Sequence, residues 1–110
     1  MGANHARVLS DTPGVELVAV ADADPERVKK AIGGRPIGGF ADAATLLREA
    51  RPDFVSIVVP TQLHEEVALQ AIAAGANVLV EKPIAATLDA ARSIAVAAEQ
   101  AGLVLTVGHI

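Results

Sequence analysis

Val-Leu-Val-Glu-Lys-Pro, at residues 78–83, carries more information about this 110-residue chain than any other stretch. An apolar, β-rich run ends there abruptly in an acid, a base and a proline. In an open α/β sheet the carboxyl ends of the strands form the ligand crevice. The stretch therefore predicts a strand that delivers Glu81 and Lys82 to that crevice, with Pro83 ending the strand and fixing the direction of Lys82. The alternative is a solvated strand end with a surface ion pair, which contributes little.

Strand-like and helix-like segments alternate along the chain, which predicts a parallel sheet with right-handed crossover connections. Strands are expected at residues 15–22, within 33–39, and at 54–59, 77–81 and 103–107. Helices are expected at residues 4–11, from Pro25 to about Ile32, from Asp42 to Ala50, from Thr61 to just before Gly75, and from about Thr87 onward. Asp24 with Pro25, Asp42 and Thr61 are the predicted helix starts.

The composition favours a small α/β domain over other classes. Hydrophobic residues make up 52% of the chain, but only Phe40 and Phe54 are aromatic, so the core is expected to consist of Val, Leu, Ile and Ala. The net charge is −4 with no basic run, so no nucleic-acid partner is expected. The apolar runs are strand-sized, so no membrane span is expected either.

Metal and disulfide chemistry are not expected. The chain has no cysteine, which excludes disulfides and thiolate sites and fits a cytoplasmic location. His5, His64 and His109 are far apart in the sequence and lack the spaced partners that a zinc site needs.

Asp22 ends the strand expected at residues 15–22. In dinucleotide-binding folds an acid at this position accepts hydrogen bonds from the adenosine ribose, about 20 residues after the glycine turn. Gly2 lies 20 positions earlier, and Ala23 stands beside Asp22 with no arginine there. The alternative is that Asp22 only starts the turn before the next helix.

Pro60, Thr61 and His64 follow the strand at residues 54–59. Thr61 can cap the next helix, and two glutamates in the first turn suit the helix dipole. His64 has two interpretations. It is either a satisfied structural group in the first helical turn or, at the edge of the crevice, a group that faces a cofactor.

Bacterial receiver domains are a competing fold of similar length. They have acids after the first strand and Lys-Pro after the fifth, which Asp22, Asp24 and Lys82 imitate. They also need an Asp that accepts phosphate after the middle strand. That strand ends here at residues 59–60, Val-Pro, and Asp53 lies at its amino-terminal end. The receiver interpretation therefore fails on its central residue.

The chain resembles the nucleotide-binding domain of the Gfo/Idh/MocA family, named for glucose–fructose oxidoreductase and inositol dehydrogenase. The resemblance covers essentially the whole chain and implies a doubly wound parallel sheet of the Rossmann, NAD(P)-binding type. The stretches that carry it are Gly2 with His5-Ala6-Arg7, residues 18–22, Pro60-Thr61 with His64, Gly75, and Glu81-Lys82-Pro83. The combination of Pro-Thr-x-x-His with Glu-Lys-Pro at this spacing is more specific than either motif alone.

The resemblance implies an NAD(P)-dependent oxidoreductase that transfers hydride between nicotinamide and a hydroxyl of a sugar, cyclitol or sugar nucleotide. Asp22 would bind the adenosine ribose and favour NAD over NADP, because a 2′-phosphate would meet its negative charge. Glu81 would position the nicotinamide end of the cofactor. Lys82 would be the catalytic residue, orienting or polarising the substrate hydroxyl. The implied cofactor-binding residues are Gly2, Asp22, Pro60, Thr61, His64, Glu81 and Lys82.

The chain also departs from the family pattern. Asn77 stands where a histidine is often found, and Val59 where a threonine is common. The first strand and the leading Gly-x-Gly are missing, so residues 1–110 are expected to be a partial dinucleotide-binding domain. The C-terminal catalytic domain, with the proton acceptor and any surface for homo-oligomers, would then be absent. The alternative function is a non-catalytic module that senses NAD(P).

Overall fold

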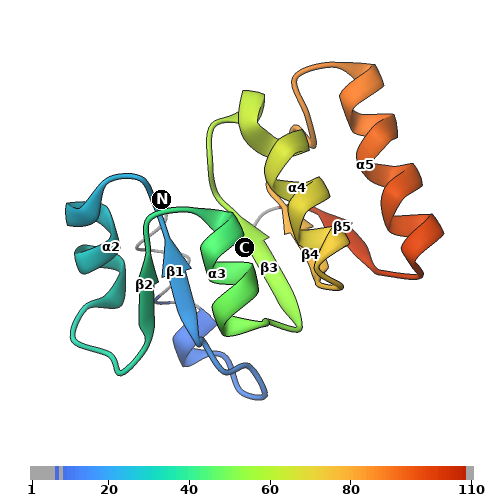
Figure 1. The fold of residues 1–110 in the computed structure, drawn as a ribbon. Coiled ribbons are helices and arrows are strands. Elements are labelled where there is room, and N and C mark those ends of the chain that lie inside the picture. Colours follow the sequence, from blue (N-terminus) through green and yellow to red (C-terminus); the bar gives the residue numbers. More distant parts are fainter. Residues whose placement is uncertain (1–6, 8, 109–110) are drawn as a thin grey trace. The chain divides into compact units, whose positions relative to one another are not determined.

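The computed structural model describes residues 7 and 9–108 and follows the predicted alternation of strands and helices (Figure 1). Its elements in chain order are β1 (Ala19–Ala21), α2 (Pro25–Ile32), β2 (Gly38–Phe40), α3 (Ala43–Ala50), β3 (Phe54–Ile57), the 3₁₀ turn η1 (Thr61–Leu63), α4 (His64–Ala73), β4 (Asn77–Val80), α5 (Leu88–Ala101) and β5 (Leu105–Val107). Of the helix expected at residues 4–11, the described part is helical. The chain divides into two compact units, Met1–Arg51 and Pro52–Ile110, and each is described by itself.

The first unit contains β1 and β2, which pair in parallel with Ala19 opposite Gly38. Both α2 and α3 pack on this pair of strands. The amide of Asp22 donates to the carbonyl oxygen of Phe40 at 3.1 Å, which extends the ladder past the end of β1. The strand expected at residues 15–22 is therefore shorter than predicted, because its partner β2 has only three residues.

Glycine at position 39 allows α2 to lie close to β2. A Cβ atom at this position would lie 2.7 Å from Cγ1 of Val28 and 2.9 Å from Cδ1 of Ile32. Because the β-branched Val28 cannot turn away freely, a larger residue would push the helix off the strand.

The second unit contains a parallel sheet in the order β3-β4-β5, with Phe54 opposite Asn77 and Val78 opposite Leu105. The helix α4 packs on β3 and β4, and α5 packs against α4. The core consists of small aliphatic side chains as predicted, and its buried members include Ile57, Ala68, Ala71, Ile72, Val78, Val80, Ile94 and Ala98. Within the described residues, no strand pairing joins this sheet to β1 and β2.

The strand expected at residues 54–59 forms at Phe54–Ile57 and is only partly buried. Only Ile57 is buried in β3, and Phe54 is 37% exposed. Among the described strands β3 pairs only with β4, so nothing in this sheet covers its other side.

The side chain of Asn77 ties the amino ends of all three strands together. Its Oδ1 accepts from the amide of Val104 at 2.9 Å, and its Nδ2 donates to the carbonyl oxygen of Asp53 at 3.3 Å. The amide of Asn77 also donates to the carbonyl oxygen of Asp53 at 3.0 Å. A carboxamide suits this place because it carries a donor and an acceptor on one short side chain.

Three of the helix starts have side-chain caps. Asp24 Oδ1 accepts from the amide of Glu26 at 2.9 Å, as the Asp-Pro signal predicted. Asp42 caps α3 by accepting from the amide of Thr45 at 2.7 Å. Thr87 caps α5 through its hydroxyl.

The prediction that Thr61 caps a helix is wrong. The 3₁₀ turn η1 begins at Thr61 and separates it from α4, and neither η1 nor α4 has a side-chain cap. The amide of Leu63 donates instead to the carbonyl oxygen of Pro60 at 2.9 Å. A backbone carbonyl thus takes the place that the threonine hydroxyl was expected to fill.

The cap at Asp42 predicts a dependence of stability on pH. The hydrogen bond from the Thr45 amide, supported by the Thr45 side chain and Arg48, lowers the pKa of Asp42 below its ordinary value of 3.8. The charged cap therefore stabilises the protein above that value and is lost as the pH falls through the lower pKa of the folded state. The difference in Tm between wild type and Asp42→Asn should be constant above about pH 5 and shrink below 3.8. A constant difference down to about pH 2 would contradict this assignment.

Candidate functional site

The carboxyl edge of the second sheet carries most of the predicted site residues. Because β3 and β4 are parallel, the segments that follow them leave the sheet at the same edge. Pro60 and Thr61 follow β3, whereas Glu81 and Lys82 follow β4. Glu81 is half-buried, Lys82 is exposed, and the Lys82–Pro83 peptide bond is cis. The sheet therefore presents a flexible cation to solvent beside a partly covered acid.

His64 is buried at this edge, with only 3% of its surface exposed. Its Nδ1 lies 3.1 Å from the carbonyl oxygens of both Pro83 and Ile84. Its Nε2 lies 3.0 Å from the carbonyl oxygen of Val59. The ring thus contacts the segments that follow β3 and β4. A direct contact between His64 and a cofactor stays a prediction, and these bonds support the structural interpretation instead.

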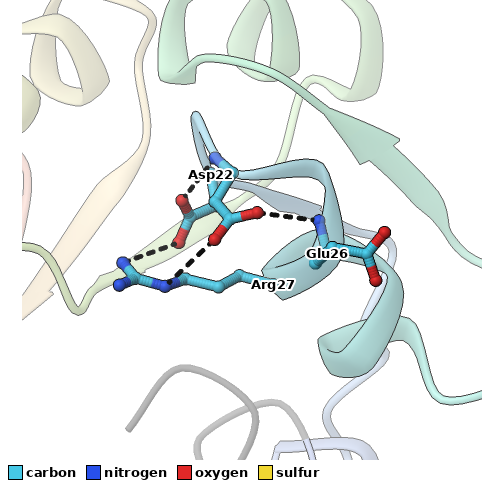
Figure 2. A network of polar contacts seen from close by, with 4 residues as sticks. Asp22, Glu26 and Arg27 are labelled. Carbon is cyan, nitrogen blue, oxygen red and sulfur yellow. Dashed lines mark hydrogen bonds and ion pairs between the residues drawn. The ribbon is translucent and has the colours of Figure 1, made fainter.

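Asp22 stands at the carboxyl end of β1 in the first unit, as predicted. Its side chain is 36% exposed, and Oδ1 accepts from the amide of Asp24 at 2.9 Å. The guanidinium of Arg27 lies 4.0 Å from Oδ2 of Asp22 and 3.6 Å from Oδ2 of Asp24 (Figure 2). The turn therefore orients the carboxylate while leaving part of it open to a ligand.

Although Ala23, and not an arginine, follows Asp22 in the sequence, the structure brings the side chain of Arg27 close to it. Arg27 lies in the first turn of α2 and is 75% exposed. The sequence signal for its position was the spacing of three residues between the N-cap Asp24 and Arg27 in the first turn of α2, over which the two side chains meet.

A shallow hollow of about 210 Å³ opens beside Asp22. Its lining residues are Asp22, Ala23, Pro25, Val28, Gly39, Phe40 and Ala41. The wall is mostly apolar and includes the carboxylate of Asp22. Val28, Gly39 and Phe40 carry no local sequence signal for a site, because tertiary contacts bring them beside Asp22: the pairing of β1 with β2 places Gly39 and Phe40, and the packing of α2 on these strands places Val28.

Three further sequence predictions concern Gly2, metal binding and membrane spans. Gly2 lies outside the described residues. Within residues 7 and 9–108, no cluster of three or more His, Asp or Glu side chains could hold a metal ion. In the same part of the chain, no helix is both long enough and apolar enough to cross a membrane.

Comparison with known proteins decides the family. The sequence profile described as "Oxidoreductase family, NAD-binding Rossmann fold" matches residues 1–109. The chain belongs to the Gfo/Idh/MocA family. Its relatives in this family include the D-apiose dehydrogenase of Paraburkholderia graminis, 37% identical over 107 residues that cover 94% of this chain and 28% of that protein. The inositol 2-dehydrogenase 1 of Saccharopolyspora erythraea is 40% identical over 90 residues, covering 79% of this chain and 27% of that enzyme.

Solved structures of other proteins show the same fold. GenD2 from gentamicin A biosynthesis, in complex with NAD, has a TM-score of 0.88 at 36% identity over 97% of this chain and 30% of its own. The scyllo-inositol dehydrogenase of Lactobacillus casei, with bound NAD(H) and scyllo-inositol, has a TM-score of 0.87 at 25% identity, covering 94% of this chain and 32% of its own. The predicted Rossmann-type parallel α/β fold is thereby confirmed. The chain spans less than a third of the length of these relatives.

Proposed function

We propose that the protein, at its full natural length, transfers hydride between NAD and a hydroxyl of a sugar, cyclitol or sugar nucleotide. The observation that carries this proposal is the turn after β4, which presents Lys82 at the carboxyl edge of a parallel sheet. The family supports it, because relatives of this chain are named as dehydrogenases of inositol and D-apiose.

The residues of the first unit fit the adenosine half of NAD. The hollow beside Asp22 is apolar enough for a ring, and the open part of the carboxylate can accept hydrogen bonds from ribose hydroxyls. Asp22 would hold the ribose and disfavour a 2′-phosphate. Gly2, for which the structure gives no placement, stays a predicted phosphate-loop residue.

The turn after β4 supplies the groups proposed to act at the reacting end. Bound NAD would supply the hydride acceptor. Lys82 would contact the substrate hydroxyl and stabilise the negative charge that develops on its oxygen as its proton leaves. Glu81 would orient the nicotinamide end, and Pro60 and Thr61 would border it. We place the proton acceptor, and any homo-oligomer contact, in a catalytic domain outside residues 1–110. A cytoplasmic location stays a prediction.

The test measures binding and turnover separately. The full-length protein is titrated with NAD by calorimetry and then assayed for NADH formation with a panel of cyclitols, aldoses and sugar nucleotides. We expect NAD binding and saturable turnover with at least one of these compounds. NAD binding without turnover on any of them would favour the non-catalytic sensing module instead.

A further inference from the structure

We infer that His64 is a positioning residue that holds the Lys82 turn against the start of α4. The inference rests on the proposed function, since it assigns His64 a part in placing the catalytic lysine. It differs from the prediction that the ring faces the cofactor. The ring is buried, and each of its nitrogens already lies at hydrogen-bond distance from a backbone carbonyl.

The carbonyl oxygens around the ring indicate which of its two nitrogens, Nδ1 or Nε2, holds the Lys82 turn. A neutral imidazole donates from one nitrogen only, and carbonyl oxygens can only accept. Two carbonyls, of Pro83 and Ile84, lie 3.1 Å from Nδ1, whereas only that of Val59 faces Nε2, at 3.0 Å. We assign the proton to Nδ1, because a single N–H there can be shared between two acceptors; the contact of Nε2 with the Val59 carbonyl oxygen is then a close approach of two acceptors and not a hydrogen bond.

The turn that His64 contacts contains no regular secondary structure. Residues 81–86 lie between the end of β4 and the cap of α5 and form neither helix nor strand. The Lys82 side chain is exposed, so its direction depends on its own backbone. Because Pro83 is the next residue, a hydrogen bond to the Pro83 carbonyl restrains the backbone directly after Lys82. A displacement of about 1 Å at a reacting centre can cost on the order of a hundredfold in rate.

Three substitutions separate the two sides of the ring. In His64→Asn the amide nitrogen takes roughly the place of Nδ1 and can donate to Pro83 and Ile84. In His64→Gln the amide reaches the place of Nε2, beside Val59. In His64→Phe the ring volume is kept and both nitrogens are lost.

We expect kcat of the full-length enzyme to fall about a hundredfold in His64→Phe and His64→Gln, and to stay within about threefold of wild type in His64→Asn. The Kd for NAD and the KM for substrate should change by less than about threefold in all three, because the ring is not expected to touch either ligand. A large rise in the Kd for NAD in His64→Phe would overturn the inference and return His64 to the cofactor site. Equal losses of kcat in His64→Asn and His64→Phe would also overturn it.

Amide hydrogen exchange over residues 81–86 tests the same contact without any assay of activity. Exchange there should be faster in His64→Phe and His64→Gln than in wild type and His64→Asn. Ile72→Ala serves as the control, since Ile72 is buried in α4 about 12 Å along the helix from His64. It should lower Tm without a selective effect on residues 81–86. Unchanged exchange there in the Phe and Gln variants, or the same rise in the control, would refute the contact.

Turnover and hydrogen exchange test the proposed hydride transfer and the positioning role of His64 separately. If wild type oxidises no substrate, the proposed function fails while the exchange data still decide the role of His64. If His64→Phe does not fold, the comparison of His64→Asn with His64→Gln decides alone.

Discussion

Lys82→Ala is expected to lower kcat of the full-length enzyme on the order of a hundredfold or more, because the ammonium is proposed to act on charge that develops only in the transition state. The Tm should change little, since the Lys82 side chain is exposed at the end of β4 and packs in no core. The Kd for NAD should stay close to that of wild type. The measurement is steady-state turnover beside calorimetric NAD binding and thermal unfolding.

Two further variants make the Lys82 result specific. Lys29→Ala removes an exposed lysine from the last turn of α2 and should leave kcat unchanged. Lys82→Arg keeps the charge but changes its shape and reach, so partial activity is expected. Full turnover in Lys82→Ala, or a variant that unfolds, would contradict the prediction that Lys82 acts on chemistry more than on folding.

Asp22→Ala is expected to weaken NAD binding by roughly 10- to 100-fold, because hydrogen bonds to a charged acceptor contribute about 1.5–3 kcal/mol. Asp22→Asn keeps an acceptor for the Asp24 amide and removes the charge. It therefore separates the effect of the side chain's orientation on NAD binding from the effect of its charge. In both variants the preference for NAD over NADP should shrink. Calorimetric titration of wild type and both variants with both cofactors gives the six constants needed.

The position of Arg27 beside Asp22 adds a second expectation to the titration of the Asp22 variants with NADP. In wild type its guanidinium lies near two carboxylates, of Asp22 and Asp24. Without the Asp22 charge, the Arg27 guanidinium keeps only the Asp24 carboxylate as a neighbour and can contact a 2′-phosphate. The affinity for NADP should therefore rise while the affinity for NAD falls. The double variant Asp22→Ala with Arg27→Ala should not show that gain. Tighter binding of NADP than of NAD by wild type would contradict the assigned role of Asp22.

The architecture could be predicted from sequence because its signals are local. Asp24 followed by Pro25 marks the start of α2, and the run from Asn77 to Val80 is a strand of the predicted type. The position of Lys82 after that strand follows from the same pattern. These features depend on backbone geometry within a few residues, and the structure confirms them.

The contacts that shape the site could not be predicted, since they join segments that are distant in sequence. His64 meets the carbonyl oxygen of Ile84, 20 residues away, and no periodic pattern signals such a bond. Thr61 was expected to cap a helix, but the amide of Leu63 donates to the backbone carbonyl of Pro60 and not to the Thr61 hydroxyl. The exposure of Phe54 depends on which strands surround β3, which its own residues do not determine.

The carboxamide of Asn77 has a consequence at the opposite end of β4. In a parallel ladder, a slip of one residue turns every side chain to the other face, and a slip of two moves each by roughly 6.6 Å along the strand. Either alternative pairing would shift Glu81 and Lys82 relative to the segment that follows β3. Because Asn77 matches one donor and one acceptor on two neighbouring segments, misaligned pairings lose both bonds at once. Asn77, at the amino end of β4, therefore helps to fix the register of the strand. The register in turn sets where Lys82 leaves the sheet at the carboxyl edge.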